Sequence, residues 1–317
     1  LARRGRGPRV VCDLIDDPWI TYRSQPWFER MRAGGLKQAV VVRRLRSRLI
    51  GLLDGCTAVA PRDAASLARA TGRQVRVVPN GVIVPETYRA DALRENLVVF
   101  TGAMQFPPNV AAACWLVRRV WPRVLRALGG DRSGRSNGSA PAQLAIVGTS
   151  PAAAVRRLAE VPGVVVTGAV ADVNEWLRRA RVAAVPMTTG SGIKNKVLEA
   201  GAAACAVVST SLGVAGLPSG DNNGSLVADR PAAFAEKIVT LLENPALARA
   251  IGLAGRAMVG RQYRWPRMAE LMMEVLRGPE AEEGTDAPGT GSPASAEGLQ
   301  GPCESSRVEE ALTHAAP

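Results

Sequence analysis

The stretch MTTGSGIKNKVLEAGAAACAVVST, from Met187 to Thr210, decides the fold. A strand ends near Pro186, a turn rich in Gly, Ser and Thr follows, and a helix begins near Ile193 or Lys194. The backbone N–H groups of such a turn attract an anion, and the helix dipole adds to that attraction. In open α/β sheets, ligands bind at the carboxyl ends of strands, which is where this turn falls. The stretch therefore predicts an anion site on a parallel sheet.

On both sides of this stretch, short apolar runs alternate with helical patterns, which is typical of parallel βαβ units. Several runs show no polar alternation, as expected for strands that are covered on both faces. The predicted strands are Arg9–Leu14, Cys56–Ala60, Gln74–Pro79, Leu97–Gly102, Gln143–Gly148, Val164–Thr167, Val182–Pro186 and Cys205–Ser209. The predicted helices are 36–53, 61–71, 108–127, 150–160, 172–180, 194–204, 231–243, 245–262 and 264–277.

Breaks in composition divide the chain. Asn80-Gly81 and the polar residues after it indicate a turn and a linker. The last segment is dominated by Gly, Pro, Ser, Ala and Glu, which predicts a disordered tail. Three predicted strands precede the linker and five follow it, so we expect the first domain to be incomplete. The predicted divisions are a partial first domain at 1–84, a linker at 85–96, a second domain at 97–262, a final helix at 263–278 and the tail at 279–317.

The composition limits the class of function. The net charge is +12 although residues 279–317 are acidic, so the positive charge is concentrated before the tail and favours anionic partners. Aromatic residues make up only 4% and do not interleave with basic ones, which argues against nucleic acid. Five scattered cysteines indicate reduced thiols and a cytoplasmic protein. The single histidine, His314, lies in the tail, which argues against a Ser-His-Asp triad or a histidine-ligated zinc.

Lysine is rare in this chain, and two of its four lysines, Lys194 and Lys196, lie at the glycine-rich turn. A lysine ammonium is a compact cation that suits a diphosphate. Glu199 follows three residues after Lys196, roughly on the same helix face, where its carboxylate could accept hydrogen bonds from ribose hydroxyls. The plainer interpretation is a solvated Lys–Glu pair at a helix start. The order of strand, Gly-Ser-Gly, lysines and Glu favours a nucleotide site.

GSGIKNKVLEA resembles the donor-site segment of the glycosyltransferase family 4 group, the glycosyl transferases group 1. The resemblance extends to VVPNGVIVP (Val77–Pro85), to VVFTGAMQFPPNVAAACWLVRRVWP (Val98–Pro122), and to LAIVGTSP, VVVTGAVADVNEWLRRARVAAVPM and SLVADRPAAFAEKIVTLLENP. These segments follow the order and spacing of the family over roughly residues 9–278. Their form is closest to a subgroup associated with bacterial exopolysaccharide assembly.

The resemblance implies a GT-B-like α/β fold with two facing, doubly wound, Rossmann-like domains. It also implies a retaining transferase that moves a sugar from a nucleotide-diphosphate donor to a glycan or lipid-linked acceptor, with no metal or other cofactor. Glu199 matches the family glutamate that grips the nucleotide ribose. The donor-binding residues that it implies are Gly102, Gly190, Ser191, Gly192, Ile193, Lys194, Lys196 and Glu199.

The sequence departs from the family pattern in three places. Many members carry a second glutamate where this chain has Ser191, so nothing here indicates which sugar is used. A lysine or arginine often follows the Gly102 loop, and this chain has Phe106-Pro-Pro-Asn109 instead, which leaves phosphate binding to the lysines and the turn amides. The first strands and the acceptor-side catalytic residues of the family have no counterpart. Asp13 and Asp16 are candidates for orienting an acceptor, although loop-capping aspartates are the plainer interpretation.

Other functions remain open at this stage. A truncated remnant could bind nucleotide sugar without transferring it, and the same fold serves sugar-nucleotide epimerases and phosphorylases. The amphipathic stretch Val40–Leu53 could also contact anionic membrane as a peripheral helix, near a lipid-linked acceptor. Packing of its apolar face on the sheet is the plainer interpretation.

Overall fold

The computed structural model describes residues 9–14, 50–86, 93–129, 141–218 and 223–278, with a few positions between residues 20 and 48. The predicted tail at 279–317 and the middle of the predicted linker lie outside the described residues. So does most of the predicted helix 36–53. Of the apolar face predicted for that helix, Val41 and Leu52 lie among the described positions, and both are exposed.

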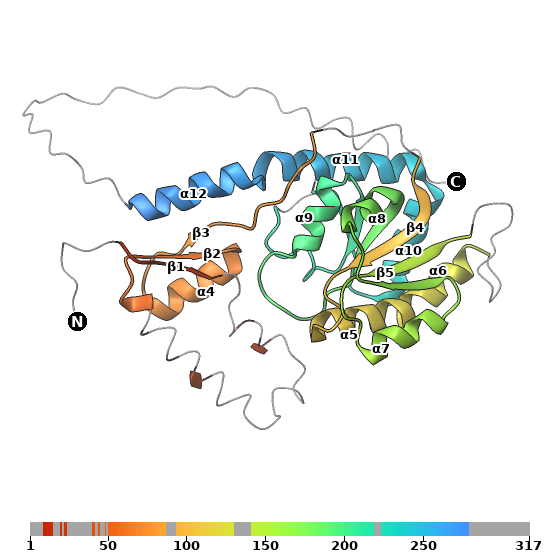
Figure 1. The fold of residues 1–317 in the computed structure, drawn as a ribbon, viewed down its shortest axis with the longest axis horizontal. Coiled ribbons are helices and arrows are strands. Elements are labelled where there is room, and N and C mark those ends of the chain that lie inside the picture. The colour runs from red at the N-terminus through yellow and green to blue at the C-terminus, as the bar shows by residue number, and fades with distance from the viewer. Residues whose placement is uncertain are drawn as a thin grey trace, which may run out of the picture. The chain divides into compact units, whose positions relative to one another are not determined.

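A parallel sheet of six strands forms the larger part of the described chain (Figure 1). Its order is β6-β5-β4-β7-β8-β9, so the chain starts in the middle, winds to one edge, returns and winds to the other. This is the doubly wound topology, and the direction of winding changes between β4 and β7. The strands are β4 (Glu95–Thr101), β5 (Gln143–Val147), β6 (Val164–Gly168), β7 (Ala180–Val185), β8 (Ala206–Ser209) and β9 (Ser225–Val227).

Helices cover both faces of this sheet. Figure 1 shows α5 (Pro107–Trp115), α6 (Trp121–Ala127) and α7 (Ala153–Arg156) on one side of it, and α8 (Val173–Arg179), α9 (Asn195–Ala202) and α11 (Pro245–Gln262) on the other. α10 (Pro231–Glu243) packs against α6, and α12 (Trp265–Arg277) ends the described chain. None of the helices that the structure describes has the length and apolar character needed to cross a membrane.

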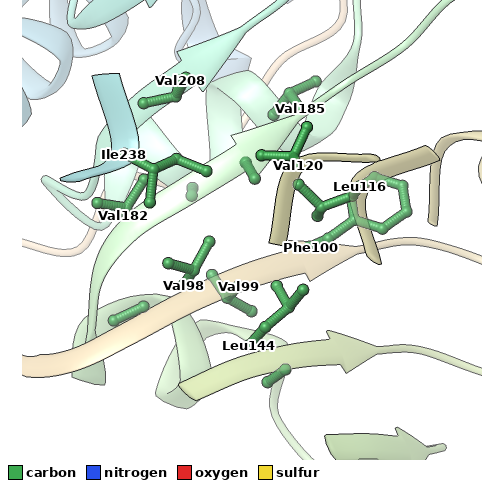
Figure 2. Packing of buried hydrophobic residues seen from close by; sticks show 14 of the residues in the cluster. Val98, Val99, Phe100, Leu116, Val120, Leu144, Val182, Val185, Val208 and Ile238 are labelled. Atoms are coloured by element: carbon green, nitrogen blue, oxygen red, sulfur yellow. The ribbon is translucent and has the colours of Figure 1, made fainter. Parts of the chain in front are cut away.

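The core of the six-stranded sheet is built mainly from aliphatic side chains. Val98, Val99 and Phe100 of β4 lie at its centre, in contact with strands on either side and with the helices above them (Figure 2). All three are at most 1% exposed. Because the strand is covered on both faces, its sequence is an unbroken apolar run. The other labelled members of this cluster are Leu116, Val120, Leu144, Val182, Val185, Val208 and Ile238.

The predicted single helix 108–127 is wrong in its middle. The chain forms a π turn at Leu116–Val120 between α5 and α6. Pro122 has no N–H with which to continue the α-helical ladder, and the N–H of Trp121 reaches back five residues to the carbonyl of Leu116. The turn therefore accommodates the proline without ending the helical path.

A second parallel sheet is described, with the order β1-β2-β3. Its strands are β1 (Val11–Leu14), β2 (Gly55–Ala58) and β3 (Arg76–Val77), and α4 (Pro61–Thr71) packs against β2 and β3. The predicted strand Gln74–Pro79 shrinks to two residues in β3. The strand β9 was not predicted because its three residues are too few to show a periodicity.

An apolar cluster, which we call the bridging cluster, joins the two sheets. It contains residues that follow β2 and residues of the α9 and α11 region: Val59, Ala60, Ile193, Leu198, Ala202, Met258, Val259 and Tyr263. Beside it, the N–H of Val82 donates to the carbonyl of Tyr263 at 2.7 Å. The α9 helix, which follows the glycine-rich turn, is thus packed against both parts of the fold.

Candidate functional site

The carboxyl ends of β4 and β7 meet at the point where the winding direction of the sheet changes, and this is where doubly wound sheets bind ligands. A cavity of about 540 Å³ opens there. Seven of the eight residues predicted to bind a donor line it: Gly102, Gly190, Ser191, Ile193, Lys194, Lys196 and Glu199. The fold thus brings together residues up to 97 positions apart in sequence, from Gly102 to Glu199. The eighth, Gly192, does not line the cavity.

The floor of the cavity is made by backbone. Gly102 follows β4, Gly148 follows β5, and both have a φ of 152°. A Cβ added to Gly148 would lie 1.7 Å from the carbonyl oxygen of Gly102, so only glycine allows these two loops to touch. A Cβ on Gly102 would lie 2.7 Å from the side-chain nitrogen of Asn109 and 3.2 Å from Nζ of Lys196. The pair of glycines therefore gives a ligand close access to the strand ends.

Lys196 is the basic group at the centre of the wall. Its Nζ donates to Oδ1 of Asn109 at 2.7 Å and lies 4.4 Å from the ring centroid of Phe100. Asn109 is fixed in turn, because its Nδ2 donates to the carbonyl of Ala103 at 3.0 Å. Burial lowers the pKa of Lys196 to about 7, with the Glu199 carboxylate opposing the shift and the Lys194 charge adding to it. An anion in the cavity would offset the cost of charging this ammonium.

Lys194 stands at the N-cap of α9, which begins one residue later at Asn195 than the sequence predicted as its latest start. Its Nζ donates to the carbonyls of Ser191 and Gly192, the latter at 3.0 Å. Gly190 and Gly192 have positive φ angles of 116° and 68°. The lysine therefore folds back over the turn that precedes it and brings a second positive charge to the cavity wall.

Glu199 lies one turn further along α9 and also lines the cavity. Burial raises the pKa of its carboxyl group, and the charge of Lys196 opposes that shift. A half-buried carboxylate at this place can accept hydrogen bonds from neighbouring hydroxyl groups of a ligand. The carboxylate and the two ammonium groups are arranged for a ligand that carries both hydroxyls and negative charge.

Among the lining residues that were not predicted as site residues are two asparagines and an exposed aromatic side chain. Asn80, which follows β3, donates from its Nδ2 to Oδ1 of Asn195 at 2.8 Å. Phe106 is 51% exposed at the cavity although it is a large apolar side chain. Asn109 is the partner of Lys196. All three lie in segments with a local signal, the Asn-Gly turn and Phe-Pro-Pro-Asn. The local sequence does not show which strand end these side chains face.

Of the two acceptor-side candidates, Asp13 is described by the structure and Asp16 is not. Asp13 lies in β1, where its Oδ1 accepts a hydrogen bond from the hydroxyl of Thr57 on β2, and it does not line the cavity. Asp16 lies outside the described residues. This hydrogen bond gives Asp13 a structural role, because it joins β1 to β2.

Comparison with known proteins agrees with this architecture. Residues 95–244 match the model of the family described as glycosyl transferases group 1. No curated protein sequence matches the chain. Among solved structures, the chain is similar to TarM from S. aureus in complex with fondaparinux, alpha-GlcNAc-glycerol and UDP (14% identity, TM-score 0.59), covering 76% of this chain and 47% of that one.

Two further solved structures are similar. Sucrose-phosphate synthase from Thermosynechococcus elongatus has 20% identity and a TM-score of 0.59, over 78% of this chain and 64% of that one. HepE from Anabaena in complex with UDP-glucose has 16% identity and a TM-score of 0.58, over 85% of this chain and 71% of that one. At these identities the likeness shows the fold, and the predicted GT-B fold class is confirmed. The chain spans about half the length of TarM.

Proposed function

From the match of residues 95–244 to the model of the glycosyl transferases group 1 family, we propose that the chain transfers a sugar from a nucleotide-diphosphate donor and binds that donor in the cavity at the carboxyl ends of β4 and β7. One observation carries the proposal. The cavity, at the topological switch point, has a glycine floor and a wall that holds two lysines and a glutamate. These are the groups that a diphosphate attached to a ribose needs.

The residues of the cavity wall would each bind a different part of the donor. Lys196 and Lys194 neutralise the diphosphate, while Glu199 accepts hydrogen bonds from the ribose hydroxyls. When the bond between sugar and diphosphate breaks, negative charge builds up on the departing diphosphate. Fixed cations at that place stabilise the transition state more than the ground state, which is how they accelerate the reaction. In this proposal the lysines supply the positive charge, and no metal ion is needed.

UDP is the first candidate for the nucleotide, because the TarM and HepE structures to which the chain is similar contain UDP or UDP-glucose. We propose retention of the anomeric configuration, with a glycan or lipid-linked acceptor in cell-surface polysaccharide synthesis. The location would be the cytoplasm, with peripheral contact to the inner face of the membrane. These finer statements rest on the family resemblance.

Calorimetric titration of the full chain with UDP, GDP and ADP tests the proposal. We expect micromolar binding of one of them, and a loss of at least about tenfold in Glu199→Ala, which corresponds to about 1.4 kcal/mol or one ribose hydrogen bond to a charged group. The matched control is Glu236→Ala, which removes an exposed carboxylate from α10, away from the cavity. Absence of binding to a folded chain, or an equal loss in both variants, would refute the donor site.

A further inference from the structure

Gly192, the predicted donor-binding residue that does not line the cavity, is held by a side chain of α4. Its N–H donates to Oδ2 of Asp63 at 2.9 Å. Asp63 lies in the first turn of α4, 129 residues earlier in the sequence, and is only 2% exposed. A buried carboxylate that accepts from a backbone N–H makes a strong, charge-assisted hydrogen bond. The turn is therefore tied to α4 at this point.

The surroundings of this bond are closed. The space beside it, lined by Ala60, Asp63 and the turn, measures about 10 Å³, which holds at most about one water molecule. Asp63 does not line the 540 Å³ cavity, and neither does Gly192. The carboxylate is thus placed to hold the turn and is not placed to contact a ligand of the size of a nucleotide.

Apolar packing on the next residue acts in the same direction. Ile193 belongs to the bridging cluster together with Val59 and Ala60, which lie between β2 and α4. A Cβ added to Gly216 would lie 3.0 Å from Ile193 and 3.2 Å from Ala60, so this junction is tightly packed. With Gly192 bonded to Asp63 and Ile193 packed against the residues before α4, two consecutive residues of the turn are held by α4 and by the residues that join it to β2.

We infer that Asp63 is a positioning residue for the donor site, which holds Gly192 so that Gly190, Ser191 and Lys194 face the diphosphate. This inference rests on the proposed function for what the site binds. The carbonyl of Gly192 accepts from Lys194 Nζ while its N–H donates to Asp63, so one peptide segment connects α4 to a phosphate-facing cation. Loss of the bond frees the turn and costs affinity for the diphosphate part of the ligand, while the nucleoside part keeps its contacts.

The test compares Asp63→Leu, which removes the acceptor and keeps a branched side chain, with Asp63→Asn, which keeps an acceptor oxygen. Asp63→Ala is a second, less bulky variant in case the leucine disturbs folding. Asp229→Ala is the matched control, because Asp229 also accepts from a loop N–H, that of Ser211 at 2.8 Å, but lies away from the cavity. Each variant is titrated with UDP, GDP and ADP and with the corresponding nucleosides. Hydrogen exchange is followed in peptides covering residues 187–195.

We expect Asp63→Leu and Asp63→Ala to weaken binding of the diphosphate about tenfold and of the nucleoside less than about twofold, with Asp63→Asn close to wild type. We also expect faster exchange at residues 187–195 in the Leu and Ala variants, with or without ligand. Unchanged exchange, or equal losses for diphosphate and nucleoside, would overturn the inference. If the wild-type chain binds no nucleotide, the proposed function fails by itself. The exchange of the turn then still decides whether Asp63 holds it.

Discussion

At the scale of single residues, the buried ammonium of Lys196 couples the site to pH. Its pKa is lowered from 10.5 to about 7 by burial, so between these two values the unfolded chain binds a proton that the folded chain does not. Stability must therefore rise with pH across that window, by about 1.4 kcal/mol per pH unit for one proton. We predict that Lys196→Met removes this slope and raises stability at pH 7, while it abolishes binding of the diphosphate.

Urea denaturation of both proteins at several values between pH 7 and pH 10 measures this effect. The difference between wild type and variant isolates Lys196, because other groups titrate in the same range. Burial raises the pKa of Cys205 to about 11, for example, and this makes stability fall as the pH rises above the ordinary thiol value. A wild-type minus variant difference that stays flat with pH would mean that Lys196 remains charged in the folded protein.

At the scale of elements, the approach of the loops after β4 and β5 depends on Gly148. A Cβ there would overlap the carbonyl oxygen of Gly102, and the loops would have to separate. We predict that Gly148→Ala destabilises the chain by about 2 kcal/mol or more and also weakens nucleotide binding, because it lifts the floor of the cavity. Gly168→Ala is the control, since Gly168 ends β6 with a φ of 69° and has open space around it. Equal destabilisation by the two variants in thermal melts would contradict the overlap argument.

The sequence predicted elements best where a local signal marks both ends. The helices 231–243 and 245–262 match α10 and α11 at every boundary, because Pro231 and Pro245 begin them and Asn244 separates them. The unbroken apolar runs around Val98 and Val182 predicted β4 and β7 for the same kind of reason. The sequence did not predict β9, because that strand is too short to show a periodicity. It did not predict the π turn either, because a long helical pattern hides the irregular middle of the helix.

The sequence predicted cavity-lining residues where they are contiguous, and it missed residues that the fold brings to the cavity from a distance. The turn and α9 hold seven of the eight predicted donor-binding residues within ten positions, so these residues form one local pattern in the sequence. Asn109 and Asp63 act on that turn from helices 87 and 129 residues away from their partners. In the local sequence, Asp63 is an ordinary acidic residue in the first turn of a helix. An acidic side chain is favourable at that place without any distant partner.

At the scale of the whole described chain, we expect the bridging cluster to make the two sheets one cooperative unit. Tyr263 is 4% exposed in that cluster, and its carbonyl accepts the N–H of Val82 on the far side of the linker. We predict that wild type melts in one calorimetric transition and that Tyr263→Ala, at a cost of about 3 kcal/mol, splits it into two. Phe234→Ala is the control, because this fully buried ring lies within the core of the six-stranded sheet and its loss should lower the melting temperature without splitting the transition. Two transitions in wild type, or one in Tyr263→Ala, would show that the cluster does not couple the sheets. Asp63 would then hold the glycine-rich turn only through the hydrogen bond that it accepts from the N–H of Gly192.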